Sequence, residues 1–525
     1  MLEFLLVRLT ALARLLPLML VPDSAAYSAH AAACLALGTR ADLNLTFSTT
    51  ISSATYLRAG SRVKPQGTCL GPTDRVRVSA DVCRVQFVVH TTNVSAVTAE
   101  TWLPRPDQWE GRFLALGNSG IGGCIDYDRL QYGASLQFAT VGSNNGHDGN
   151  DGRVFLDAPE VLTDFASRSV HVSTVISKQL LSAYYTRPHS KSYYLGCSTG
   201  GRQGTYAALH HPDDFDGIVA GAPATDNNHL VHWVGMLTRW AGAPDGPASP
   251  AFISTEQWGA VTAEIMRQCD ALDGVVDGIV TEPDACRFRP EALLCSDGNS
   301  NCLSLEQVKV LRKIYAPLYA DDELVYPRFD PGAEASPLVR WVFNGDFFIF
   351  TEHWFKYTVA NTTEYDFHKY GRKELDLMDA VNPGGISTFE GDFSAFRDRG
   401  GKFLTYHGRM DPLIASGNSK RMYDLIAQTM SMSSLDSFYR LFLVPGMDHC
   451  EGGTPNAASR FGQGGLASNA KNDARHNVLW AVVDWVENGV APDIITGTTP
   501  DGQAERDHCR YPQRSVWDGQ VFRCE

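Results

Sequence analysis

The sequence predicts an α/β fold whose parallel sheet is interrupted by one large insertion. Three observations lead to this prediction. A short β-prone run, Ser192 to Leu195, meets a Gly-x-Ser-x-Gly turn and then a helical stretch, Gln203 to His210. Strands and helices alternate over short connections, which is typical of a parallel sheet covered on both faces. The alternation stops after Pro223 and resumes at Lys402.

Further strands are expected where β-branched and apolar residues gather between turn residues. These stretches are 85–89, 94–103, 112–116, 138–142, 215–220, 402–407 and 439–444. Long helices are expected at 161–185 and at 477–488, where apolar residues recur at helical spacing. The chain from Cys34 to Cys83 is polar, with glycine and proline turns.

Length and composition describe an ordinary globular protein. At 525 residues the chain is long enough for more than one domain. Apolar residues make up 44% of it and charged residues 20%. The net charge of −14 argues against a nucleic-acid partner. Beyond the N-terminus no segment reaches about 18 uncharged apolar residues, so no membrane span is expected.

The N-terminus predicts a secretory signal peptide over residues 1–26. Arg8 and Arg14 precede a short apolar run, Leu15 to Val21, and the small residues Ser24-Ala25-Ala26 follow it. Twelve cysteines remain after cleavage near Ala26, and an even number behind a signal suggests six disulfides. Glycosylation sequons begin at three asparagines: Asn44, Asn93 and Asn361. Together these features predict a secreted, extracellular glycoprotein.

The Gly-x-Ser-x-Gly turn is Gly196-Cys197-Ser198-Thr199-Gly200. Between a strand and a helix, this turn holds the serine on a tight corner with its hydroxyl exposed. The backbone N–H of Thr199 then points toward the same space. A serine hydroxyl needs a base before it acts as a nucleophile. A chance match is the alternative, since the pattern occurs in many sequences.

An acid and a base for Ser198 are expected later in the chain. An α/β-hydrolase fold presents its triad in the order Ser, acid, His, each on a loop after a strand. Asp411 follows the strand at 402–407, and His449 follows the strand at 439–444. His449 would take the serine proton, and Asp411 would orient the imidazole. His407 and Asp448 are the rivals; either is also suited to a structural hydrogen bond.

Two cysteines give an independent check on this triad. Cys197 directly precedes Ser198, and Cys450 directly follows His449. If serine and histidine lie within hydrogen-bond reach, the two cysteines are close enough for a disulfide, which needs Cα atoms roughly 4.4–6.8 Å apart. A bridged Cys197 has no free thiolate and is excluded as the nucleophile. The alternative is that each cysteine pairs elsewhere.

These residues resemble the tannase and feruloyl esterase family. Its Cys-Ser, Asp and His-Cys arrangement stands here as Cys197-Ser198, Asp411 and His449-Cys450. The Gly-rich loop Gly117 to Cys124 belongs to the resemblance. The phosphate-loop interpretation fails there, because no Gly-Lys-Ser/Thr follows, whereas a simple surface turn stays an alternative. The loop would supply a second oxyanion donor, for which we favour Gly120, although Ser119 stands where the family has glycine.

The family resemblance also implies an inserted lid domain. We expect it over 226–394, between two parts of an α/β-hydrolase catalytic domain, 27–225 and 395–525. Ser198 and Asp411 are 213 residues apart (411 − 198), far more than a bare hydrolase domain needs.

A structural calcium ion is expected in this lid. Asp270, Asp273 and Asp277 lie within eight residues, with glycines that bend the chain, which suits a hard cation. The spacing is not that of an EF-hand. The resemblance implies two further ligands, the carbonyls of Val275 and Ile279. Without the resemblance, a solvated acidic turn is an equal alternative.

Disulfide connectivity does not follow from sequence alone. By resemblance we expect the six pairs Cys34–Cys83, Cys69–Cys124, Cys197–Cys450, Cys269–Cys286, Cys295–Cys302 and Cys509–Cys524.

The resemblance implies a serine carboxylesterase that cleaves phenolic-acid esters. Feruloyl or p-coumaroyl esters of plant cell-wall polysaccharides are the first expectation, and galloyl esters, as for a tannase, are the second. A wall-binding protein with an inactive hydrolase fold is a third alternative, which the complete triad disfavours.

Overall fold

The computed structural model describes residues 24–40, 43–71, 73–295, 302–464 and 470–525. Most of the expected signal peptide, residues 1–23, lies outside them. Helix α1 (Ser24–Leu37) already includes the last residues of that segment. Among the described helices, none combines the length and the apolar character that a membrane crossing requires.

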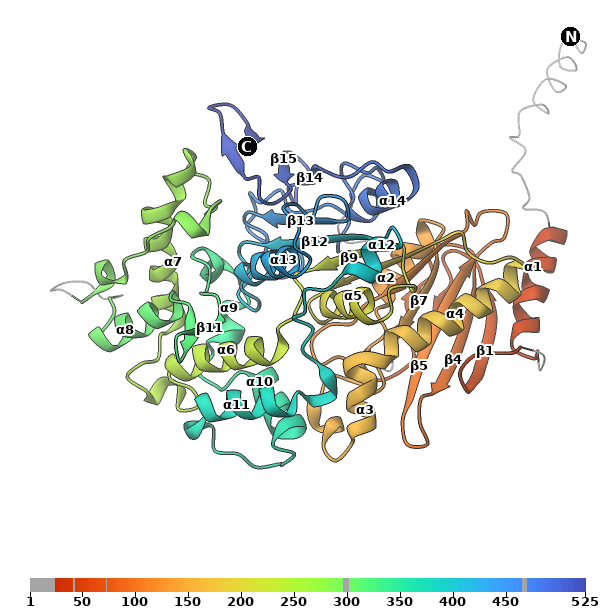
Figure 1. The fold of residues 1–525 in the computed structure, drawn as a ribbon, viewed down its shortest axis with the longest axis horizontal. Helices are drawn as coiled ribbons and strands as arrows, with labels where there is room; N and C mark the ends of the chain where they lie inside the picture. Colours follow the sequence, from red (N-terminus) through yellow and green to blue (C-terminus); the bar gives the residue numbers. More distant parts are fainter. Residues whose placement is uncertain (1–23, 41–42, 72, 296–301, 465–469) are drawn as a thin grey trace, which may run out of the picture.

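A nine-stranded mixed sheet forms the centre of the molecule, in the order β1-β4-β5-β7-β6-β8-β9-β12-β13 (Figure 1). The neighbours along β7-β6-β8-β9-β12-β13 all pair in parallel. The neighbours along β1-β4-β5-β7 pair antiparallel, so β7 joins the two parts of the sheet. Their bounds are β1 (Thr49–Leu57), β4 (Val82–His90), β5 (Ala96–Pro104), β6 (Arg112–Leu116), β7 (Ala139–Ser143), β8 (Lys191–Cys197), β9 (Gly217–Gly221), β12 (Lys402–Gly408) and β13 (Tyr439–Val444).

The expected parallel sheet continues at its N-terminal edge into antiparallel strands, which the sequence did not predict. β1 lies in the stretch that sequence analysis described only as polar with turns. Its sequence, TTISSATYL, is rich in Thr and Ser because an edge strand keeps half of its surface in water. The polar composition therefore reflects the position of the strand in the sheet.

Helices cover both faces of the sheet, and β8 divides its side chains between two hydrophobic clusters. Tyr194 packs on the face covered by α4 (Ser169–Tyr185) and α5 (Thr199–His210). Tyr193 and Leu195 pack on the other face, with α2 (Tyr127–Ser135) and α14 (Val478–Asn488). Burial on both faces explains why this strand lacks polar alternation.

The long helix expected at 161–185 consists of three consecutive pieces. α3 (Pro159–Thr163) leads into a π-helical turn, Asp164–Arg168, before α4 begins. Such π turns are frequent at functional sites. Here Phe165 of the turn lines a cavity that Ser198 also lines, and the Ala166 carbonyl accepts a hydrogen bond from the buried Arg202.

The chain between β9 and β12 leaves the sheet and forms a mainly helical region at one side of it (Figure 1). Capping boxes at Ser254 and Ser304 begin two of its helices. The elements are α6 (Asn227–Trp240), α7 (Thr255–Cys269), α8 (Leu305–Ile314), β10 (Leu318–Ala320), β11 (Glu323–Tyr326), α9 (Val339–Val342), α10 (Ile349–Trp354) and α11 (Arg372–Val381). The next helix, α12 (Ser394–Asp398), lies back at the sheet, where Phe396 packs in the same cluster as α4 and α5.

The remaining strands and one further helix lie outside this mainly helical region. They are β2 (Arg62–Val63), β3 (Val76–Arg77), α13 (Gly417–Thr429), β14 (Ile494–Thr498), β15 (Glu505–Cys509), β16 (Ser515–Trp517) and β17 (Phe522–Cys524). All six disulfides pair as the family resemblance implied.

Candidate active site

Ser198 occupies a strained corner between β8 and α5. Its φ of +64° and ψ of −122° lie in a region that side chains rarely adopt. The turn is held by two backbone bonds, Ser198 N–H to Gly221 O at 3.0 Å and Ala224 N–H to Ser198 O at 3.1 Å. A Cβ on Gly196 would lie 2.7 Å from the Gly200 carbonyl oxygen, so the motif needs glycine for close backbone approach.

Asp411 and His449 form the hydrogen-bonded pair that the triad requires. Nδ1 of His449 lies 2.7 Å from Oδ2 of Asp411. The other carboxylate oxygen accepts the backbone N–H groups of Leu413 at 2.8 Å and Ile414 at 3.0 Å. These donors fix the carboxylate, and so fix the direction in which the imidazole points.

The electrostatics of this pair favour its charged form. Burial opposes ionisation of Asp411, but the neighbouring His449 charge and the hydrogen bonds from His407 and His449 outweigh it and lower the Asp411 pKa. For His449, burial disfavours the imidazolium, but the charge of Asp411, the hydrogen bond to it and the charge of Asp448 together outweigh burial and raise the His449 pKa. An imidazolium formed during reaction is therefore stabilised.

His407 and Asp448, the alternatives to His449 and Asp411 in the expected triad, both make structural contacts. His407 is fully buried in β12, where Nδ1 lies 2.7 Å from Ser419 Oγ and Nε2 lies 2.9 Å from Ile414 O. Asp448 accepts the hydroxyl of Ser336 at 2.7 Å, and burial raises its pKa. Both side chains brace the loops that carry Asp411 and His449.

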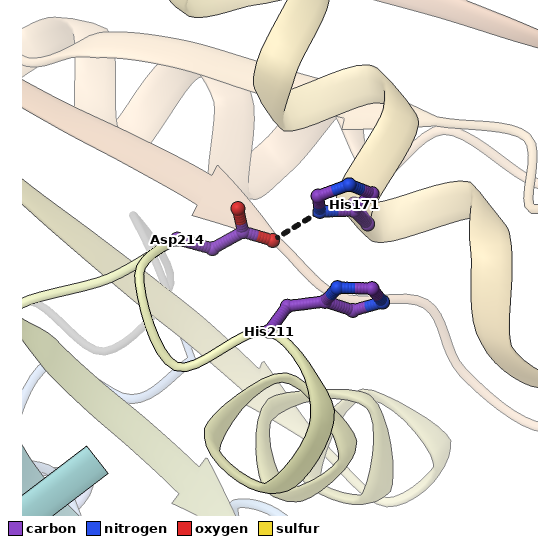
Figure 2. Close-up of side chains that lie close together, drawn as sticks. All are labelled: His171, His211 and Asp214. Atoms are coloured by element: carbon purple, nitrogen blue, oxygen red, sulfur yellow. Dashed lines mark hydrogen bonds and ion pairs between the residues drawn. The ribbon is translucent and has the colours of Figure 1, made fainter. Parts of the chain in front are cut away.

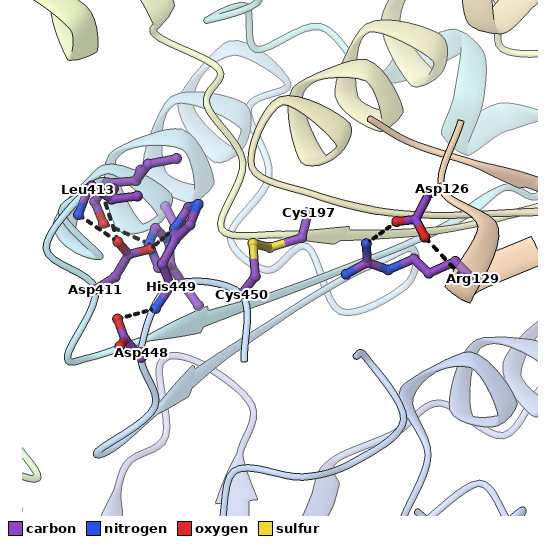
Figure 3. Close-up of a disulfide and its surroundings, with 11 residues drawn as sticks. Asp126, Arg129, Cys197, Asp411, Leu413, Asp448, His449 and Cys450 are labelled. Carbon is purple, nitrogen blue, oxygen red and sulfur yellow. Dashed lines mark hydrogen bonds and ion pairs between the residues drawn. A yellow bond between two sulfur atoms is a disulfide. The ribbon is translucent and has the colours of Figure 1, made fainter. Parts of the chain in front are cut away.

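The disulfide Cys197–Cys450 joins the serine turn to the histidine loop, with Cα atoms 5.8 Å apart (Figure 3). Ser198 and His449, the neighbours of these cysteines, both line one cavity. The bridge thus ties together two loops that are 253 residues apart in sequence.

This cavity has a volume of about 490 Å³, within the range of small-molecule sites. One wall is aromatic and comes from α9, α10 and the chain between them: Trp341, Phe348, Phe350 and Trp354. The polar lining residues include Asn150, Asn227 and Arg129. An apolar cavity with a few polar groups suits an aromatic ligand bearing ring substituents.

Thr199 and Gly120 line the same cavity. Thr199 is the first residue of α5, so its N–H has no acceptor within the helix. Its hydroxyl donates to the Gly120 carbonyl at 2.7 Å and ties the Gly-rich loop to the nucleophile turn. Gly120 has φ +57°, and a Cβ there would lie 2.8 Å from Cζ of Phe350.

Gln203, which the sequence did not single out, supports the Gly-rich loop from below. The side-chain carbonyl of Gln203 accepts the N–H of Asn118 at 3.0 Å. Its amide group donates to Asn118 Oδ1 at 3.1 Å and to Asn145 Oδ1 at 2.9 Å. The sequence offered one indication of this role: Gln203 lies about one turn into the helix that starts after Ser198, close to the serine turn.

The expected calcium loop is a compact acidic turn after α7. Asp270 accepts the N–H groups of Asp277 and Gly278 at 3.2 Å, and Asp273 accepts that of Val275 at 2.9 Å. Oδ2 of Asp273 is buried without a hydrogen-bond partner. Burial, reinforced by the charges of Asp273 and Asp270, raises the pKa of Asp277. A buried unpaired oxygen among three carboxylates fits a hard cation.

The three sequon asparagines, Asn44, Asn93 and Asn361, are all exposed. Asn361 donates its amide to Asp157 at 2.7 Å. Asn44 lies just before β1, and Asn93 lies between β4 and β5.

A family model described as tannase and feruloyl esterase matches residues 83–339 and 330–523. The chain belongs to this family. Among curated relatives in the tannase and feruloyl esterase family, a protein of Aspergillus flavus named "Probable feruloyl esterase B-2" is 44% identical over 477 residues, covering 87% of this chain and 89% of the relative. One from Aspergillus clavatus, named "Probable feruloyl esterase B", is 44% identical over 454 residues, covering 84% and 85%.

Solved structures agree with the family assignment. Feruloyl esterase B from Aspergillus oryzae superposes with a TM-score of 0.89 at 39% identity, covering 94% of this chain and all of that one. A tannin acyl hydrolase from Aspergillus niger has the same fold, with a TM-score of 0.70 at 20% identity and 94% coverage of each chain. As a member of the tannase and feruloyl esterase family with an α/β-hydrolase fold, the chain is a carboxylic ester hydrolase.

Proposed function

We propose that this protein is a secreted serine esterase that releases ferulic or p-coumaric acid from plant cell-wall polysaccharides. The observation that carries the proposal is that Ser198 and His449 share one cavity with an aromatic wall, while Asp411 holds His449 from behind.

In the proposed reaction, His449 takes the proton of Ser198 as the hydroxyl attacks the ester carbonyl. The carbonyl oxygen becomes an oxyanion in the tetrahedral intermediate. His449 then gives its proton to the leaving alcohol, and the acyl group stays on Ser198. A water molecule, deprotonated by the same imidazole, releases the acid and restores the serine.

The oxyanion is stabilised by the backbone N–H groups of Thr199 and Gly120. Preorganised donors of this kind usually make the largest single contribution to catalysis. The Thr199 N–H also lies at the positive end of the α5 dipole, which favours negative charge. The hydrogen bond from the Thr199 hydroxyl to the Gly120 carbonyl holds the Gly-rich loop beside the start of α5, so the two N–H groups keep their relative positions.

The acyl group occupies the aromatic side of the cavity. A cinnamoyl acid presents a flat ring at the end of a vinyl spacer, and the wall formed by Trp341, Phe348, Phe350 and Trp354 offers faces and edges to such a ring. The high identity to relatives named feruloyl esterase supports this choice. A galloyl ester, with three ring hydroxyls and no spacer, needs a shallower and more polar site and is the second candidate.

The segment 226–394 would serve as the lid, since it supplies the aromatic wall. A calcium ion held by Asp270, Asp273 and Asp277, with carbonyls of Val275 and Ile279, would supply structural charge neutralisation there. Six disulfides and fungal relatives are consistent with an extracellular enzyme. Secretion through a signal over 1–26 is part of the proposal.

Side-by-side hydrolysis of methyl ferulate and methyl gallate tests the function, with Ser198→Ala as the control. Cleavage of ferulate with a clear preference over gallate is the expected result, and the alanine variant should be inactive. Preference for gallate would assign tannase activity instead. Wild-type activity in the Ser198→Ala variant would refute the proposed nucleophile.

A further inference from the structure

Two histidines and one aspartate lie together at the end of α5 opposite Ser198 (Figure 2). His171 belongs to α4, His211 follows the last residue of α5, and Asp214 lies in the turn before β9. One donor atom from each of these side chains lies within 4.8 Å of the others. The proposed ester hydrolysis uses none of the three.

The backbone holds Asp214 toward His171. The Asp214 N–H donates to His211 O at 2.9 Å, which forms the turn. The Asp214 carbonyl accepts the hydroxyl of Ser192 at 2.9 Å and also the ammonium of Lys178. Because these contacts use the main chain, the carboxylate is left to bond Nδ1 of His171 at 2.8 Å.

The histidine rings lie face to face, with centroids 3.9 Å apart and planes inclined by 11°. Both side chains are half-buried, so an ion from solvent can reach them. A cavity of about 10 Å³, enough for one water molecule, is lined by both rings and by Ser169 and Tyr206. The three side chains offer three donor atoms, and the water-sized space borders the two histidine rings.

We propose that His171, His211 and Asp214 bind a divalent transition-metal ion of the zinc class. Two imidazoles and one carboxylate suit zinc, copper or nickel, whereas calcium prefers an all-oxygen set. The ion would displace the direct hydrogen bond between His171 and Asp214. Ligand atoms about 2.0–2.1 Å from a tetrahedral zinc are roughly 3.4 Å apart, so these two atoms need to separate by about half an ångström.

His211 needs a larger adjustment. A stacked ring presents its π face, and metal coordination uses the lone pair in the ring plane, so the His211 side chain must rotate out of the stack.

The charged groups around the cluster bond to partners other than the Asp214 carboxylate, which leaves that carboxylate free to bind an ion. Lys178 contacts the Asp214 carbonyl. The exposed Asp213 lies 3.3 Å from Nε of Arg399, and Asp216 contacts both Arg399 and Lys191. His210 points to Glu390 at 3.7 Å.

The ion would be structural. Helix α5 has 12 residues and is therefore about 18 Å long, which separates the site from Ser198. A bound ion would join α4 to the turn between α5 and β9. We expect a higher melting temperature with zinc and an unchanged kcat.

The test is calorimetric titration of the full enzyme with zinc chloride, after chelator treatment and return to calcium-containing buffer. Excess calcium keeps the oxygen-rich loop near Asp270 occupied, so the zinc signal reports the histidine site. We expect one zinc per chain with micromolar or tighter affinity. His211→Ala should weaken binding at least about tenfold while leaving the His171–Asp214 bond intact.

His210→Ala is the matched control, because it removes the neighbouring imidazole, which lies outside the cluster. Equal zinc affinity in the His211→Ala and His210→Ala variants, or no stoichiometric binding to the wild type, would overturn the proposal. If His211→Ala does not fold, zinc-edge X-ray absorption of the wild type decides: two imidazole ligands support the site, and fewer refute it.

Discussion

Oδ2 of Asp411 lies between two histidines, 2.7 Å from Nδ1 of His449 and 3.4 Å from Nε2 of His407. The two rings differ in what else they touch. His407 uses Nδ1 on Ser419 and Nε2 on the Ile414 carbonyl inside the core, whereas His449 lines the catalytic cavity. The same carboxylate therefore holds the ring that faces the cavity on one side and contacts a ring buried in the core on the other.

Variants of these histidines should separate the two roles. His449→Ala removes the base, and we expect kcat to fall by about 10⁴-fold or more with KM little changed. His407→Gln keeps a polar group in the core and should mainly lower the melting temperature. Steady-state kinetics and thermal unfolding of both variants measure this. A larger kcat loss in His407→Gln than in His449→Ala would contradict the assignment of the base.

The pH dependence of kcat/KM should depend on Asp448. Attraction to Asp411, with a smaller contribution from Asp448, overcomes burial and raises the His449 pKa. Since the base must be neutral to accept a proton, the acid limb should lie above the ordinary histidine value of about 6.5. Asp448→Asn removes one negative charge, so the limb should move to lower pH.

The same shift affects folding stability. A pKa raised in the folded state adds stability that is complete below the unfolded pKa of about 6.5 and is lost as pH rises through the folded value. Asp448→Asn should reduce this contribution on the acidic side. Rate profiles and denaturant unfolding between pH 5 and pH 9 check both effects; an acid limb that moves upward in the variant would rule out this explanation.

The Cys197–Cys450 disulfide should matter for catalysis as well as for stability. Replacing both cysteines with serine opens a 253-residue loop and frees the serine turn from the histidine loop. We expect a stability loss of about 2–5 kcal/mol and a lower kcat. The control is the pair Cys509 and Cys524, which closes a loop of 15 residues between β15 and β17. Its removal should lower stability but leave kcat unchanged, and equal kcat losses would argue against a catalytic contribution of the first bridge.

The strand ends that carry Ser198, Asp411 and His449 could be predicted from the sequence, because short-range patterns reveal strands. The structure places Ser198 and His449 at one cavity and Asp411 beside His449, as that prediction requires. β1 was missed because an edge strand rich in Thr and Ser looks like a polar loop. Gln203 was missed because its role depends on contacts with Asn118 and Asn145, which are distant in sequence. The stacked pair His171 and His211 depends in the same way on how α4 packs against the end of α5.

The acidic loop after α7 should bind calcium. Asp273→Asn leaves the side chain able to accept the Val275 N–H but removes the charge of an oxygen that is buried without a partner. We expect a chelator to lower the melting temperature of the wild type and added calcium to restore it, because a ligand that binds only the folded state stabilises it. The Asp273→Asn variant should start lower and respond little to either treatment. Asp473→Asn is the control, since it makes the same change at an exposed aspartate that bonds His476 and is not among the expected ligands. An equal calcium response in the wild type and Asp273→Asn would remove the ion from this loop without affecting the assignment of Ser198, Asp411 and His449.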